Sequence, residues 1–198
     1  MMGMWSLWDE IMQMFVGKGM HALSLSIDRG DFDLVLVKPV DAMFLSTFSL
    51  FDLARAAYAV FDIAIIGYGV SLLPQVVAWN GIWGGIAMLM VAVVLGYSLW
   101  VMAVTLSFRF IHIDNIHELF HSLMMLGRNP IEIFGLKARP FLFTIIPLAL
   151  IANVPSRVLL GVFEWWHVTI SITITLFFLI GARWLWNWTI NKYASASS

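Results

Sequence analysis

The stretch GIWGGIAMLMVAVVLGYSLWVMAVTLSF, Gly81 to Phe108, runs for 28 positions without a charged residue. A bilayer's hydrocarbon core is about 30 Å thick, and a helix crosses it with roughly 20 mostly apolar residues. The stretch therefore predicts a transmembrane helix that is long enough to tilt. It opens on Gly81 and Gly85, a G-x-x-x-G spacing that we interpret as a turn at the end of the span rather than a dimer interface.

Three further apolar runs lie on either side of this stretch. The run before it is AAYAVFDIAIIGYGVSLL, residues 56–73, and the runs after it cover residues 141–163 and 167–188. Pro147 and Pro155 interrupt the run over 141–163, and we expect that span to leave the membrane early. The sequence thus predicts an all-α fold, a polytopic transmembrane helix bundle of about four spans that forms one domain.

The composition supports lipid as the main solvent and excludes several functions. Hydrophobic residues make up 61% of the chain and charged residues 12%, about half the charged share of a typical soluble domain. A net charge of −1 gives no basic footprint for nucleic acid, and the absence of cysteine excludes thiol chemistry. The phosphate-binding pattern G-x-x-x-x-G-K-[ST] is also absent. We therefore expect no catalytic residue and no cofactor in this chain, and ATP hydrolysis only in a separate partner.

The distribution of lysine and arginine predicts which side of the membrane each loop faces. Of the 11 basic residues, all except Arg157 precede the first span, lie between the second and third spans, or end the fourth. Cytoplasmic loops are enriched in Lys and Arg. We therefore expect these regions to be cytoplasmic, together with both termini.

The N-terminal 25 residues do not have the pattern of a span, because Asp9, Glu10 and Lys18 interrupt the apolar run. An apolar stripe at helical spacing nevertheless passes through this region. The stripe favours an amphipathic helix that lies on the inner membrane surface. A remnant of an earlier span is the alternative. The stripe consists of Trp5, Leu7, Trp8, Ile11, Met14 and Phe15.

A charged segment, SIDRGDFDLVLVKPVDAMFLS, occupies residues 26–46, before the first span. Gly30 and the aspartates around it predict a tight turn. The residues that follow predict a short extended stretch, then Pro39, and then an amphipathic helix that leads into the span. From composition alone, a solvated loop with cytoplasmic interfacial helices is the simplest interpretation.

Two blocks of the sequence resemble the ABC-2 type transporter permeases, the membrane subunits of bacterial ATP-driven exporters. The first block, IDRGDFDLVLVKPVD, has an isoleucine, a polar pair, a glycine, acidic residues, and a basic residue followed by proline. The second block, residues 121–161, has a Gly-Arg-x-Pro turn before a span with an inner proline. The matching residues are Ile27, Gly30, Asp31, Asp33, Lys38 and Pro39 in the first block, and Gly127, Arg128, Pro130, Phe134, Pro147 and Pro155 in the second.

The resemblance implies a location, partners and a docking site. Such a permease would lie in the bacterial cytoplasmic (inner) membrane, form a dimer with a second copy or a paralogue, and export a substrate with ATP bound by an ABC ATPase subunit. Members of the family usually have six spans, so this chain resembles an N-terminally short member. In these exporters a cytoplasmic loop docks on the ATPase, and polar complementarity would fix its register. The resemblance implies this coupling role for Asp28, Arg29, Gly30, Asp31, Asp33, Lys38, Pro39 and Asp41.

Two residues in the predicted spans are candidates for the translocation path. Asp62 lies about two turns inside the first span, where an acidic residue either serves function or bonds a neighbour within the bundle. Pro147 would kink the third span and leave a carbonyl free, a common device where helices move.

The motif HELFH, residues 117–121, supports a competing hypothesis. On a helix, His117 and His121 share a face and could bind Zn²⁺, with Glu118 as general base of an intramembrane metalloprotease. The polar residues around the motif instead favour a cytoplasmic interfacial helix, and a third ligand is hard to find. An inactive permease fragment or membrane scaffold is the remaining alternative.

Overall fold

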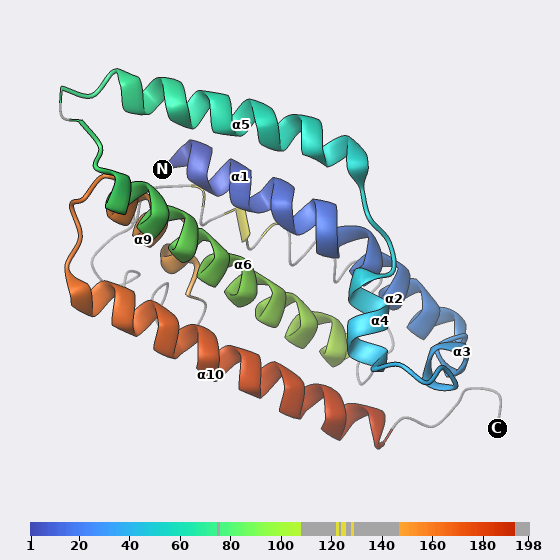
Figure 1. Ribbon diagram of the computed structural model, residues 1–198. Coiled ribbons are helices and arrows are strands. Elements are labelled where there is room, and N and C mark those ends of the chain that lie inside the picture. Colours follow the sequence, from blue (N-terminus) through green and yellow to red (C-terminus); the bar gives the residue numbers. More distant parts are fainter. Residues whose placement is uncertain (75, 108–121, 123, 126–127, 129–146, 193–198) are drawn as a thin grey trace.

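The computed structural model describes residues 1–74, 76–107, 122, 124–125, 128 and 147–192. Each regular element in this part of the chain is a helix (Figure 1), which confirms the all-α class. In chain order, the elements are α1 Met2–Met12, a π-helical turn Gln13–Gly17, α2 Lys18–Arg29, α3 Asp33–Leu36, α4 Ala42–Phe48, α5 Leu53–Ser71, α6 Trp79–Ser107, α9 Leu148–Leu159 and α10 Trp165–Ile190.

Three of these helices, α5, α6 and α10, are long and apolar enough to cross a membrane. They coincide with the spans predicted over residues 56–73, 81–108 and 167–188, with small shifts at the ends. The start of α5 is fixed by Asp52, whose carboxylate accepts a hydrogen bond from the Ala54 N–H at 3.2 Å. Such an N-cap satisfies one of the backbone donors that a helix leaves free at its start.

The span predicted over residues 141–163 is described from Pro147 onward, and residues 141–146 lie outside the described residues. The described part forms α9, which has 12 residues and ends at Leu159. Pro147 is the N-cap of α9, with ψ of 49°. The part of the predicted span before it lies outside the described residues, so the kink at Pro147 stays a prediction. A proline at this place costs little, because the first turn has no acceptor for its missing N–H. Pro155 is the proline inside α9.

The N-terminal region is helical as predicted, and α1 packs against other helices of the bundle. The side chain of Trp8 is 1% exposed, and its Nε1 donates a hydrogen bond to the Ala92 carbonyl of α6 at 3.0 Å. Gly96 makes room for the indole, since a Cβ there would lie 2.3 Å from Cζ2 of Trp8. The apolar stripe of α1 is therefore covered by other helices of the same chain.

A second close contact joins α6 to α9. A Cβ added at Gly81 would lie 2.7 Å from the Leu159 carbonyl oxygen, and one added at Gly85 would lie 3.0 Å from Leu159 Cβ. The G-x-x-x-G pair therefore forms a packing seam within the chain, and its interpretation as a turn marker is wrong. Small residues at such seams let two helix backbones approach closely.

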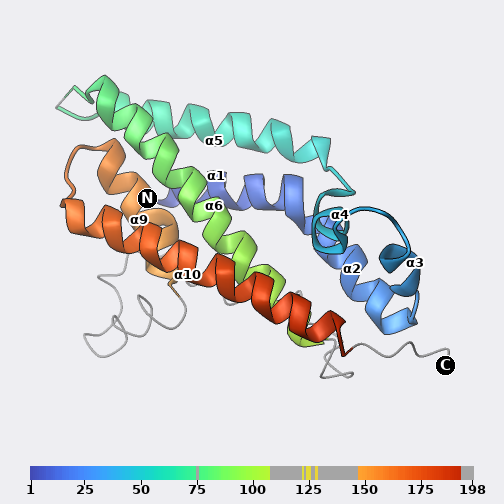
Figure 2. The ribbon, with the colours of Figure 1, turned by 60° about the horizontal axis from the view of Figure 1, so that its bottom comes forward.

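The helices run side by side, with α5 and α10 at opposite sides of the bundle and α6 between them (Figures 1 and 2). Segment 26–46 and the C-terminal residues of α10 lie at one end of the bundle, which we call the charged end. The opposite end, which holds the α5–α6 and α9–α10 links, is the link end. Antiparallel α1 and α5 are joined near the charged end by an ion pair of Glu10 and Arg55, 3.3 Å apart.

Met1 and the last residues of α10 lie at opposite ends of this bundle (Figure 1). Met1 lines a pocket with Leu73 and Leu160 at the link end, whereas α10 finishes at the charged end. The helical region from α1 through α2 runs along the length of the bundle and does not lie across one end of it. The expectation that both termini are cytoplasmic stays a prediction.

Candidate functional site

Segment 26–46 turns at Gly30, whose backbone has the left-handed conformation, and this confirms the turn predicted from the sequence. Gly30 follows the last residue of α2, Arg29, and has a φ of 74°. Its N–H donates to the Ile27 carbonyl at 3.1 Å, and the Asp31 N–H donates to the Ser26 carbonyl at 2.9 Å. Glycine adopts this backbone without strain, so Gly30 shapes the segment and does not offer a side chain for docking. Asp28 lies in the last turn of α2.

The stretch after the turn is helical, and the prediction of an extended backbone is wrong. Asp33–Leu36 forms α3, and the side chain of Phe32 just before it is 0% exposed. The Phe32 ring meets the ring of Trp186 on α10 edge-on, with centroids 6.1 Å apart. A short helix here, rather than an extended strand, keeps Phe32 in the core. The Asp33 carboxylate lies in the first turn of α3, where a negative charge complements the helix dipole.

Asp41 connects the segment to the last membrane helix. It is the N-cap of α4, and its Oδ1 accepts from the Phe44 N–H at 3.0 Å. The Arg183 guanidinium of α10 donates to both carboxylate oxygens, Nη1 to Oδ1 at 3.0 Å and Nη2 to Oδ2 at 2.5 Å. Bidentate pairs of this kind fix geometry as well as charge. The segment is thus attached to α10 through Asp41 and Phe32.

The Asp41–Arg183 pair changes the acid–base behaviour of the aspartate. Hydrogen bonding from Arg183 is the main cause that lowers the pKa of Asp41, and it outweighs the opposing effect of burial. A lowered folded-state pKa means that the pair stabilises the fold above the unfolded-state pKa of about 3.9. That stabilisation is lost as the pH falls through the lower folded-state pKa.

We expect Asp41→Asn to lower the Tm of the detergent-solubilised protein at pH 7 and to lose this effect under strongly acidic conditions. Asparagine caps a helix as well as aspartate does, so the variant removes the charge and keeps the cap. The side chains of Asp41 and Arg183 are 41% and 47% exposed, and exposed ion pairs contribute about 0.2–1 kcal/mol to the free energy of unfolding. The Tm difference at pH 7 should therefore be at most about 4 °C. An equal Tm difference at pH 7 and under strongly acidic conditions would contradict a stabilising ion pair between Asp41 and Arg183.

The rest of the segment forms an exposed tip. Leu34, Val37 and Val40 are 71%, 83% and 50% exposed, and together with Lys38 and Pro39 they define what we call the tip. Asp31 is exposed beside it, whereas Asp33 is half-buried. Of the residues implied by the resemblance, Arg29, Asp31, Lys38 and Pro39 are thus accessible to a partner. Asp41 is exposed as well, but it is paired with Arg183. The sequence analysis missed the apolar members of the tip, although three large aliphatic residues in a charged segment were the available signal.

Asp62 faces the interior of the bundle. Its side chain is buried at 7% exposure, whereas its neighbours Phe61 and Ile63 are 66% and 57% exposed. It interacts electrostatically with Glu10 of α1, so it lies on the face of α5 that packs against α1. This is the bundle-facing alternative of the sequence analysis. Its role in a translocation path stays a prediction.

The metal hypothesis concerns residues that the structure does not describe. His117, Glu118 and His121 lie outside the described residues. Within the described part of the chain, no group of three or more His, Asp or Glu side chains is placed to hold a metal ion.

Three membrane-length helices packed with shorter ones, and a charged segment at one end, define a multi-pass α-helical membrane protein. The chain belongs to the ABC-2 family of transporter proteins, because the family model described as "ABC-2 family transporter protein" matches residues 1–197. It is thus the permease component of an ABC-type transporter, a transport component that is not itself catalytic. No curated protein and no solved structure matches it.

Proposed function

We propose that this chain is an export permease of the cytoplasmic membrane that docks a separate ABC ATPase through the tip of segment 26–46. The observation that carries the proposal is the exposure of Leu34, Val37 and Val40 at the charged end. Aliphatic side chains gathered on an exposed surface beside charged residues favour a contact site for a partner. Asp31 and Lys38 beside them supply charges that can fix the register of a partner.

The attachment of the segment explains how docking could act on the membrane helices. Asp41 and Phe32 join it to α10. On its other side, α4 lies so close to α2 that a Cβ at Gly19 would be 2.0 Å from the Thr47 carbonyl oxygen. A force applied at the tip by closure of an ATPase dimer would therefore reach α10 and α2 together. This mechanism suits a permease dimer, formed by two copies or by this chain and a paralogue.

The charge distribution supports a cytoplasmic charged end. Lys18, Arg29, Lys38 and Arg55 all lie in or beside the elements of that end, and basic residues favour the cytoplasmic side. In this orientation the tip would face the compartment that supplies ATP. The link end and Met1 would then face outward.

Affinity capture of the tagged chain from its native membrane, with partners identified by mass, tests the docking proposal. We expect a stoichiometric P-loop ATPase with the wild type and at least tenfold less with Val37→Asp, a loss of about 1.4 kcal/mol or more in binding. Val76→Asp is the matched control, since Val76 is 97% exposed in the α5–α6 link at the opposite end.

Each outcome of this capture experiment has a clear meaning. Equal recovery of the ATPase with Val37→Asp and wild type would exclude the tip as the docking site. Recovery of no ATPase with the wild type would favour the alternative of an inactive permease or scaffold. Both substitutions replace exposed side chains, so neither should disturb the fold.

A further inference from the structure

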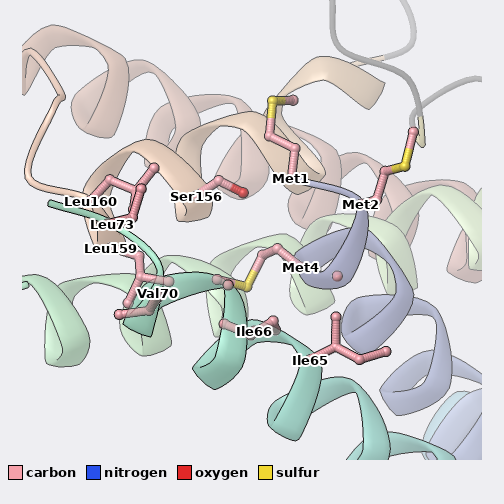
Figure 3. Close-up of a pocket in the computed structure, with 12 residues that line it drawn as sticks. Met1, Met2, Met4, Ile65, Ile66, Val70, Leu73, Ser156, Leu159 and Leu160 are labelled. Carbon is pink, nitrogen blue, oxygen red and sulfur yellow. The ribbon is translucent and has the colours of Figure 1, made fainter.

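A pocket of about 360 Å³ opens at the link end of the bundle, between α1, α5 and α9 (Figure 3). Met1 and the first residues of α1 form one wall, and Ser156, Leu159 and Leu160 form another. The third wall comes from α5 and the residues just after it, namely Ile65, Ile66, Gly69, Val70 and Leu73. α1 and α5 approach closely on one side of the pocket, where a Cβ at Gly3 would lie 3.0 Å from Ile66 Cγ1.

The side chains of the pocket wall are almost all apolar, although the wall also includes the N-terminal residue Met1. Eleven of its 12 lining residues lack a polar side-chain group, and the exception is Ser156. The Ser156 hydroxyl already donates to the Ala152 carbonyl at 2.6 Å. A water molecule in a buried site needs two to four polar partners, so water is a poor occupant here. An apolar cavity left empty forfeits dispersion contacts along its wall.

The pocket is continuous with the exposed surface of α5. Ile65 and Leu73 line the pocket and are also 45% and 41% exposed, and α5 is one of the helices suited to cross a membrane. A second pocket of about 440 Å³ lies next to it and shares Leu73, Leu159 and Leu160 with it. The apolar space thus extends from the exposed side of α5 along the link end.

We propose that this pocket binds one acyl chain of a membrane lipid, which enters beside α5 and lies between α1 and α9. The size falls in the range of ligand sites, about 300–1,000 Å³. A flexible aliphatic chain matches an apolar wall, and the methionine side chains adapt to its shape. The site is independent of any ATPase, so it can be tested on the permease alone.

The test uses the full chain reconstituted in phosphatidylcholine vesicles that contain a trace of the same lipid with a photoreactive diazirine on one acyl chain. After irradiation, mass spectrometry maps the cross-linked residues. We expect adducts concentrated on Met1–Met4, residues 65–73 and residues 156–160. Gly69→Leu should reduce the adducts in the pocket at least tenfold, because the new side chain occupies the pocket space.

Gly67→Leu is the matched control for this experiment. A Cβ at Gly67 or Gly69 meets no atom within 4 Å, and both glycines lie in α5, but only Gly69 lines the pocket. Both variants should therefore fold, with similar Tm values, and Gly67→Leu should keep the wild-type adducts. The proposal is overturned if wild-type adducts spread evenly along α5, or if Gly69→Leu leaves the pocket adducts unchanged.

Discussion

Gly19→Ala is expected to destabilise the protein by roughly 1–3 kcal/mol or more, because it forces α4 away from α2. The new Cβ would lie 2.0 Å from the Thr47 carbonyl oxygen and 2.6 Å from that of Ser46. Both acceptors belong to the backbone, so no side-chain rotation relieves the overlap. Alanine favours a helix over glycine by about 1 kcal/mol, and a net loss of stability would therefore isolate the clash. Thermal unfolding in detergent, followed by circular dichroism, measures it.

Gly67→Ala is the control for this substitution. Its Cβ meets no atom within 4 Å, so only the gain in helix propensity remains, and Tm should stay equal or rise slightly. If Gly19→Ala behaved like Gly67→Ala, the contact between α2 and α4 would be wrong. The arrangement that holds segment 26–46 beside the membrane helices would then be wrong as well.

Single cysteines at the two ends of the bundle are expected to react with a membrane-impermeant maleimide from opposite sides of the membrane. The chain contains no cysteine of its own, so the background is zero. Val76→Cys should react from one side and Val37→Cys from the other. Met2→Cys should react from the side of Val76→Cys but more slowly, because Met2 lines the pocket proposed to hold an acyl chain. The parent side chains of Met2, Val76 and Val37 are 57%, 97% and 83% exposed, respectively. The measurement is the labelled fraction in right-side-out and inverted vesicles, and the expected contrast is near-complete labelling against background.

Val76 and Val37 serve as reference positions in this experiment, because they lie at the link end and at the charged end. If Met2→Cys labelled together with Val37→Cys, the N-terminus would be on the side of the segment. That result would support the interpretation of the N-terminal region as an amphipathic helix on the inner membrane surface. Labelling of Val37 from the outer face would reverse the proposed orientation and leave the packing of α1 unaffected.

The sequence predicted the membrane-length helices well because their signal is local. An uncharged run such as that of α6 has few ways to satisfy its backbone in lipid other than a helix. The turn at Gly30 was equally local, since a left-handed residue between aspartates favours glycine. The burial of α1 was not predictable in this way. An apolar stripe with Trp8 on it indicates that one face is covered, and the same stripe fits a membrane surface or a neighbouring helix.

The contacts that define the candidate site could not be predicted from the sequence, because they join residues that are far apart along the chain. Asp41 and Arg183 are 142 positions apart, and nothing in either local pattern selects the other residue. The packing seam at Gly81 and Gly85 could not be predicted for the same reason, because its partner, Leu159, belongs to a helix that is distant in sequence. Glycine spacing shows that a close approach is possible, but not which backbone makes it.

The π-helical turn at Gln13–Gly17 sets the angular phase between the two halves of the N-terminal helix. Each residue of an α-helix advances about 100° around its axis, and a π turn accommodates an extra residue without breaking the helix. The face that α1 turns toward α6 at Trp8 is therefore not aligned with the face that α2 turns toward α4 at Gly19. Loss of one residue here would rotate α2 by about 100° relative to α1, so the length of this short stretch is a geometric constraint on the whole bundle.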